Sequence, residues 1–229
     1  MKEKKKGNII PLLIIVIVVL IIVVGLILGK SINGNDKNKE NNKEENTKLE
    51  KLTGKQEFSK YCNKSETCKK EIGIVTINNK DLKLSVNIEN FNTNKMHGTI
   101  SLGSNKLTLP GLEESSYTKS LDGIEVYKDY LIVYTSELKA LEYASCDELN
   151  GIREYQIFVF DSEGKEKTGL TGYTIKNAFS DIKIEDDNIY YYSIASTGKA
   201  ITYNKISFDD FLNRNWEAKT IVKNAKECK

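Results

Sequence analysis

Residues 75–84 read VTINNKDLKL, in which apolar residues alternate with polar ones on both sides of the polar run Asn78-Asn79-Lys80-Asp81. Alternation with a period of two is typical of β-strands that are buried on one face. Asn and Asp also tolerate the backbone conformations that tight hairpin turns require. This stretch therefore predicts a β-hairpin.

The same pattern occurs twice more along the chain. Residues 124–133 (IEVYKDYLIV) align with residues 75–84 at an offset of 49, and residues 182–191 (IKIEDDNIYY) align with residues 124–133 at a further offset of 58. A following strand also repeats, because residues 100–104, 158–162 and 206–210 share an apolar-x-apolar pattern before a polar turn. The sequence therefore predicts three β-meander units, and self-similarity of this kind is typical of repeat folds.

The predicted fold is mainly β, with an antiparallel all-β domain built from these units. A trefoil-like barrel, an open propeller-like arrangement and a plain β-sandwich all remain compatible with the pattern. One short helix is expected near the end of the chain, where Asp209 or Asp210 would cap a turn that carries Phe211, Leu212 and Trp216.

A hydrophobic run precedes the β-rich part. The 20 residues from Ile9 to Leu28 are apolar except for Pro and Gly, and no charge occurs between Lys6 and Lys30. As a helix this run would cover about 30 Å, the thickness of a bilayer core. We expect a transmembrane signal-anchor over residues 9–29 rather than a cleaved signal peptide, because the run is too long and Leu28-Gly29-Lys30-Ser31 is a poor cleavage site.

The Lys-rich tail, residues 1–8, is expected to be cytoplasmic, with the rest of the chain outside the cytoplasm. Residues 30–56 are rich in Asn, Lys and Glu and predict a disordered polar linker. A short Cys-containing helix or loop over residues 57–71 and a β-rich extracytoplasmic domain over residues 72–229 complete the predicted organisation. The protein is therefore expected to be in the cell membrane, which it crosses once, and membrane lipid is one expected partner.

The four cysteines, Cys62, Cys68, Cys146 and Cys228, all follow the apolar run. An even number in a translocated domain indicates two disulfides. Three pairings are possible; we favour Cys62–Cys68 across a small loop and Cys146–Cys228 at the C-terminus. Unpaired thiols or a Cys₄ zinc site are the alternatives, although the C-x₅-C spacing is not that of zinc modules.

Charge and residue content exclude several functions. Residues 1–29 carry four Lys and one Glu, so this segment is +3; the remainder, with 30 basic and 31 acidic residues, is −1. No concentrated basic segment indicates nucleic-acid binding. The single His97 has no local catalytic signature, and Asp161–Lys165 lacks the spacing of a calcium loop. We expect no cofactor and no metal, and no residue is assigned as catalytic.

Aromatic residues are the remaining functional signal. Tyr190, Tyr191, Tyr192 and Trp216 are candidate partner contacts, and Tyr191 should face away from Tyr190 and Tyr192 because strand side chains alternate. The expected function is a membrane-anchored binding or assembly module for an envelope protein or a cell-wall glycan. The alternatives are a glycan hydrolase with paired carboxylates, such as Asp186, Asp187, Asp209 and Asp210, and a structural subunit of an envelope complex.

Overall fold

The computed structural model describes residues 49–229 except 116, 139–151, 175–177, 195–199 and 228–229. These residues form three antiparallel sheets and few helices, as the repeat predicts. The predicted transmembrane helix lies outside the described residues. Within residues that are described, no helix is both long and apolar enough to span a membrane.

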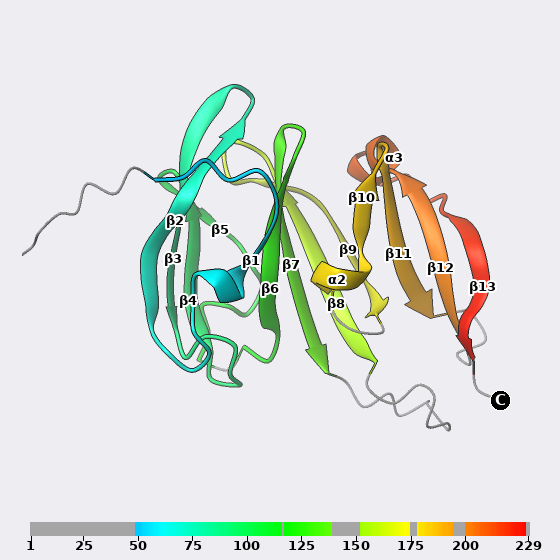
Figure 1. The fold of residues 1–229 in the computed structure, drawn as a ribbon, viewed down its shortest axis with the longest axis horizontal. Helices are drawn as coiled ribbons and strands as arrows, with labels where there is room; N and C mark the ends of the chain where they lie inside the picture. Colours follow the sequence, from blue (N-terminus) through cyan, green and yellow to red (C-terminus); the bar gives the residue numbers. More distant parts are fainter. Residues whose placement is uncertain (1–48, 116, 139–151, 175–177, 195–199, 228–229) are drawn as a thin grey trace, which may run out of the picture. The chain divides into compact units, whose positions relative to one another are not determined.

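Each sheet contains a four-stranded meander in chain order (Figure 1). The first consists of β2 (Cys68–Ile77), β3 (Lys80–Glu89), β4 (His97–Leu102) and β5 (Asn105–Leu107). The second consists of β6 (Ser120–Tyr127), β7 (Tyr130–Leu138), β8 (Arg153–Phe160) and β9 (Glu166–Thr174), with β1 (Gly54–Glu57) added beside β6. The third consists of β10 (Lys183–Glu185), β11 (Asn188–Ile194), β12 (Ala200–Ser207) and β13 (Lys219–Glu227).

The three predicted hairpins are confirmed, but the first offset is wrong by one residue. Their two-residue turns begin at Asn78, Lys128 and Asp186, so the spacings are 50 and 58 residues. These three residues have positive φ angles of 50°, 50° and 47°, as tight hairpins require. The one-residue error in the alignment arose because residues 131–134 are buried on both faces of the strand. Apolar and polar residues do not alternate there, so the sequence pattern could not define the register.

The hairpin turns lie side by side at one end of the sheets (Figure 1). The backbone N–H of Asn78 donates to Asp129 Oδ1 at 3.0 Å, and the Tyr127 hydroxyl donates to Asp187 Oδ1 at 2.7 Å. Each turn is thus hydrogen-bonded to the next one along the chain. Asp129 and Asp187 are the acceptors of these bonds, so the carboxylates of the second and third turns have a structural role.

The second sheet is buried on both faces. Leu131, Val133 and Phe160 belong to a core shared with the first sheet, whereas Ile132, Tyr134 and Val159 belong to a core shared with the third. Consecutive buried residues in β7 are therefore a consequence of the sheet's middle position. Face-to-face packing of this kind buries a separate apolar layer on each side of one sheet.

The N-terminal segment joins the first two sheets. Leu52 N donates to Ile74 O in β2 at 2.7 Å, and Gly54–Glu57 then pairs with Gly123–Val126 in β6. The predicted linker is therefore wrong over its last residues, since residues 50–56 belong to the folded domain. Residues 57–71 contain the 3₁₀ helix η1 (Phe58–Lys60), and β2 begins at Cys68, four residues before the predicted start of the β-rich part.

The helix near the end of the chain is confirmed as α3 (Phe208–Leu212), but its cap and its extent differ from the prediction. Ser207, rather than Asp209 or Asp210, is the N-cap, and its hydroxyl accepts from Asp210 N at 3.0 Å. Trp216 lies beyond the helix. A second short helix, α2 (Ala178–Asp181), lies between β9 and β10 and was not predicted.

Candidate functional site: an aromatic face on the third sheet

The outward face of the third sheet carries three tyrosine rings in contact with one another. Tyr192 pairs directly with Tyr203 across β11 and β12, and their ring centroids are 4.6 Å apart. Tyr190 lies diagonally from Tyr203, with centroids 6.2 Å apart and nearly parallel rings. Cross-strand aromatic pairs of this kind stabilise a sheet and hold the rings in fixed positions.

The opposite face of the same strands is buried. Tyr191 is only 9% exposed and packs in the core shared with the second sheet, whereas Tyr190 and Tyr192 are half-buried. The predicted division of the three consecutive tyrosines between two faces is thus what the structure shows. Tyr203 was not among the predicted contacts because its proximity to Tyr190 and Tyr192 depends on the pairing of β11 with β12, which no single segment of the sequence encodes.

A row of lysines crosses the sheet beside these rings. The row runs across four strands, from Lys183 in β10 through Tyr190 in β11 to Lys205 in β12 and Lys219 in β13. Lys205 Nζ lies 5.5 Å from the Tyr190 ring centroid. The neighbouring row ends in Val222, which is 45% exposed. We call this set the tyrosine face: Tyr190, Tyr192, Tyr203, Lys183, Lys205, Lys219 and Val222.

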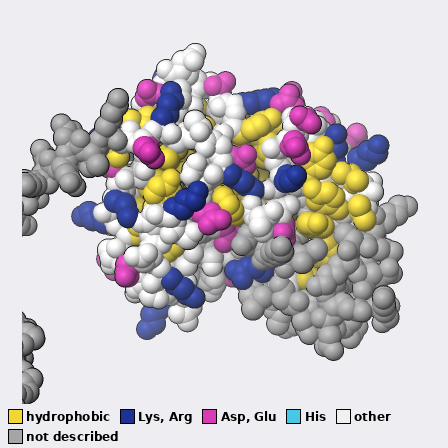
Figure 2. Space-filling view, in the orientation of Figure 1, with side chains coloured by type: hydrophobic (Ala, Val, Ile, Leu, Met, Phe, Trp, Pro, Cys, Tyr) yellow, Lys and Arg dark blue, Asp and Glu magenta, His cyan; other side chains and the backbone are white. Residues whose placement is uncertain are grey.

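Hydrophobic side chains, a class that includes tyrosine in this view, gather over the third sheet with basic side chains beside them (Figure 2). Partial burial, together with the neighbouring Tyr192 and Tyr190, raises the pKa of Tyr203. The Tyr203 hydroxyl is therefore protonated at neutral pH and available as a hydrogen-bond donor. The face combines flat aromatic area, donors and positive charge.

Trp216 is not part of this face. Its side chain is 49% exposed and its ring meets Phe211 edge-on, with centroids 5.7 Å apart. It lines a groove beside β9 instead. The four candidate contacts predicted from the sequence are therefore divided among the tyrosine face, the core and this groove.

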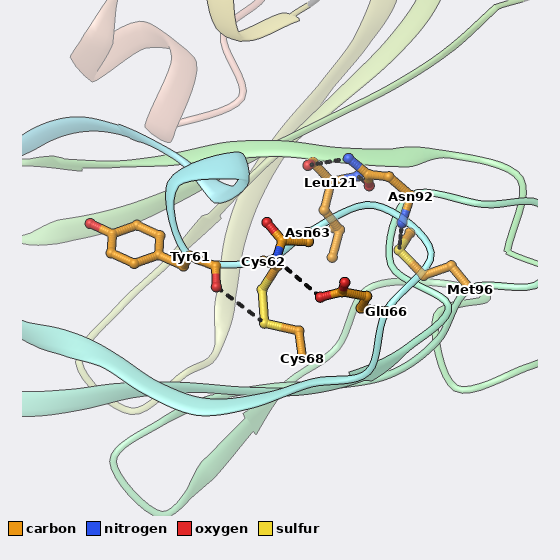
Figure 3. The surroundings of a disulfide bond; sticks show 8 residues. All are labelled: Tyr61, Cys62, Asn63, Glu66, Cys68, Asn92, Met96 and Leu121. Carbon is orange, nitrogen blue, oxygen red and sulfur yellow. Dashed lines mark hydrogen bonds between the residues drawn. A yellow bond between two sulfur atoms is a disulfide. The ribbon is translucent and has the colours of Figure 1, made fainter. Parts of the chain in front are cut away.

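The structure confirms the Cys62–Cys68 disulfide, whose Cα atoms are 5.4 Å apart. Cys146 and Cys228 lie outside the described residues. Figure 3 shows the disulfide close to the loop that holds Asn92, whose side-chain amide exchanges two hydrogen bonds with the backbone of Leu121. The disulfide therefore lies where the N-terminal segment, the first sheet and the start of β6 meet.

Of the four acidic residues considered for hydrolysis, Asp186 and Asp187 form a hairpin turn, and Asp209 and Asp210 lie in the first turn of α3. Asp187 accepts from Tyr127 and is paired with Lys128 at 3.0 Å, while Asp209 is 81% exposed at its side chain and lies 4.0 Å from the same lysine. Asp210 accepts from the Ser207 hydroxyl at the start of α3. His97 pairs with Glu89 at 3.3 Å. Among the described residues, no three His, Cys, Asp or Glu side chains are grouped to hold a metal ion.

Two partly buried polar clusters were not foreseen. In the first, Lys55 in β1 lies opposite Glu125 in β6, and the Tyr134 hydroxyl donates to Glu125 Oε2 at 2.5 Å. Burial lowers the pKa of Lys55 and raises the pKa of Glu125. In the second, Asp122 accepts from the Ser136 hydroxyl at 2.5 Å, and burial raises the Asp122 pKa to about 6. The first cluster joins residues far apart in the sequence, whereas the second lies within one hairpin and extends to Arg153, whose Nε donates to the Ser136 hydroxyl at 3.2 Å.

The Asp122 cluster predicts a pH dependence of stability. Because the folded-state pKa lies above the unfolded value, the folded protein holds a proton that the unfolded chain releases, so stability falls as pH rises from about 4 to 6. We expect Asp122→Asn, which resembles the protonated form, to be about 2 kcal/mol more stable than wild type at pH 7.5 and about equal at pH 4.

Urea unfolding of both proteins at several pH values measures this difference. Subtracting the two curves removes the contribution of all other titrating groups. A difference that does not change with pH would contradict the assignment. Asp129→Asn, the same substitution at an exposed turn of the same hairpin, is the control for replacing a carboxylate with an amide.

The chain matches no protein-family model, no curated protein and no solved structure.

Proposed function

We propose that this protein is a single-pass membrane-anchored module whose β domain lies outside the cytoplasm and binds an acidic partner protein through the tyrosine face. The observation that carries the proposal is the pair of adjacent rows on the third sheet, one with Lys183, Tyr190 and Lys205 and one with Tyr192 and Tyr203. Tyrosine supplies rigid amphipathic contact area and is enriched in protein interfaces.

A protein partner suits this face better than a small ligand. The rings lie along a sheet surface with exposed Val222 beside them, and Ile221 on the same strand is also 46% exposed. The three lysines make the face positive, with Glu185 as a nearby acid paired to Lys183 at 3.6 Å. An acidic partner complements this charge, whereas a second copy of the chain would bring like charges together.

The position of the face supports a role in presentation. The chain enters the folded domain through residues 50–57, which bridge the first and second sheets, and the tyrosine face lies on the third. Among the described residues, the N-terminal segment therefore pairs with the first and second sheets and not with the strands of the proposed binding face. As to the fold, we propose that the three successive meanders correspond to blades of an open propeller, because each blade of that fold is a four-stranded antiparallel sheet.

Charge reversal tests the proposed interaction. A photoreactive phenylalanine analogue at position 192 of the full chain should give a discrete protein adduct in intact cells, and the same analogue at position 165 should not. We expect Lys183→Glu combined with Lys205→Glu to reduce the adduct yield about tenfold, because like charges then face an acidic partner. Lys165→Glu, an exposed charge reversal in the β8–β9 turn, is the matched control.

Adducts of equal yield from both positions, or no effect of the double reversal, would overturn the proposal. Protease treatment of the intact cells before lysis tests the topology in the same experiment. The treatment should remove both the β domain and the adduct; an adduct that survives would place the domain on the cytoplasmic side.

A further inference from the structure

A groove of about 380 Å³ runs along the free edge of the second sheet, beside β9. Its lining includes Gln156 from β8, Glu166 and Thr168 from β9, and Arg214 and Trp216 from the segment after α3. The groove is distinct from the tyrosine face, which is on the outward side of the third sheet. It combines one exposed aromatic ring with several side chains that donate or accept hydrogen bonds.

Thr168 is the unusual residue of this groove. Its side chain is 1% exposed, and in the described structure its Oγ1 is buried without a hydrogen-bond partner. A buried hydroxyl without a partner is unfavourable, so such groups are rare in folded proteins. A ligand in the groove that carries hydroxyl or amide groups would provide the missing partner.

The wall opposite β9 is held in place. Arg214 has a φ angle of 58°, and its guanidinium Nη2 donates to the backbone oxygen of Lys167 at 3.2 Å. This bond fixes the Arg214 segment against the sheet edge. Trp216 follows two residues later and packs edge-on against Phe211, and the residue is 49% exposed.

We propose that this groove binds a saccharide unit of a neutral polysaccharide. A pyranose ring presents an apolar face for stacking on Trp216, and its hydroxyls suit the Thr168 hydroxyl and the planar groups of Gln156, Glu166 and Arg214. The charges of Glu166 and Arg214 balance, which favours an uncharged sugar over an anion. The site extends the proposed function to a second class of partner but does not depend on the tyrosine face.

An extended peptide added to the edge of β9 fits less well. Arg214 already occupies the Lys167 carbonyl on that edge, and the register of β8 with β9 shifts between Val159 and Phe160. Bulges and occupied edge groups prevent strand addition. A peptide is therefore an outcome that the experiment must distinguish from a sugar.

The chain contains a single Trp, so tryptophan fluorescence reports this groove alone. The full-length protein in a polyoxyethylene detergent, which carries no sugar, is titrated with chitotetraose, with cellotetraose and with a neutral unstructured peptide, and the emission is excited where tyrosine does not absorb. We expect a saturable change with at least one oligosaccharide at millimolar concentration and none with the peptide.

Thr168→Val tests the role of the hydroxyl directly, because it replaces this group with a methyl group of similar size. It should weaken oligosaccharide binding about 2- to 12-fold while leaving the melting temperature of the unliganded protein unchanged or higher. Thr118→Val, in a different groove, should bind like wild type. Lys183→Glu with Lys205→Glu should also bind like wild type, which separates this site from the tyrosine face.

Two results would overturn the proposal. One is the absence of a saturable change with both oligosaccharides, or a change with the peptide instead. The other is unchanged affinity in Thr168→Val, which would show that the unpartnered hydroxyl does not face the ligand.

Discussion

Replacing Lys55 with Met should lower the free energy of unfolding by about 3–5 kcal/mol, because the change leaves a buried carboxylate without its counter-charge. The Lys55 ammonium lies 4.8 Å from the Tyr134 ring centroid and 4.9 Å from that of Phe179. It donates to the backbone oxygen of Ile182 at 2.5 Å and to that of Phe179. One side chain from β1 thus holds α2 and its following residue against the second sheet.

Glu125 would be the group left unpaired. It is 7% exposed, and Tyr134 is its hydrogen-bond donor. The double variant Lys55→Met with Glu125→Gln should therefore be more stable than the sum of the two single changes indicates, since it removes both charges together. Urea unfolding of the four proteins in a double-mutant cycle measures this coupling.

Lys51→Met is the matched control. Lys51 is in the same N-terminal segment, but its side chain is 57% exposed and its ion pair with Asp81 is 3.6 Å long. We expect this substitution to cost less than about 1 kcal/mol. Similar losses for Lys51→Met and Lys55→Met would contradict the role assigned to the buried lysine.

The sequence predicted those features of the fold that are encoded locally. Hairpins over residues 75–84 and 182–191 have polar turns flanked by alternating apolar residues, and both signals lie within ten residues. The turn after β8 was also recognisable: Asp161 Oδ1 accepts from the N–H of Glu163 and of Lys165, and Gly164 has a φ angle of 71°.

Features that depend on how the three sheets and the N-terminal segment pack against one another could not be predicted from short stretches of sequence. Strand β1 reads GKQE and contains no apolar residue, so nothing in its composition indicates a strand. It forms because β6 has a free edge there. The Lys55–Glu125 pair likewise joins a segment that resembled a flexible linker to a strand about 70 residues later.

The candidate sites show the same division. The alternation of Tyr190, Tyr191 and Tyr192 between two faces follows from strand geometry alone. The addition of Tyr203 to that face depends on the register of β11 with β12. The groove around Trp216 depends on contacts between β9 and the segment after α3, which are distant in the sequence.

Two glycines make room for the N-terminal segment at the sheet edges. Gly73 and Gly123 occupy equivalent positions, 50 residues apart, each next to a register shift in the first strand of its meander. A Cβ atom at Gly73 would lie 2.8 Å from the backbone oxygen of Glu50, and one at Gly123 would lie 2.6 Å from that of Gln56. The chain therefore crosses both edges at points where no side chain can be accommodated.

Gly123→Ala should lower the free energy of unfolding by about 3 kcal/mol or more, because the new methyl group also lies 2.4 Å from the Phe179 ring. Either β1 or α2 must move away from the second sheet. Hydrogen exchange should show lost protection for the β1 amides while β11 and β12, on the third sheet, keep theirs. Protection would therefore be lost by local opening of the N-terminal segment and not by unfolding of the whole domain.

Gly54→Ala separates this steric effect from backbone conformation. Gly54 is in the same strand pair with a φ angle of 59°, but nothing lies within 4 Å of an added Cβ. Its cost should be about 1 kcal/mol, from the left-handed backbone alone. If Gly123→Ala costs no more than Gly54→Ala and the β1 amides stay protected, then close contact at Gly123 does not hold the N-terminal segment. In that case the backbone hydrogen bond from Leu52 to Ile74 in β2 would be the contact that holds the segment.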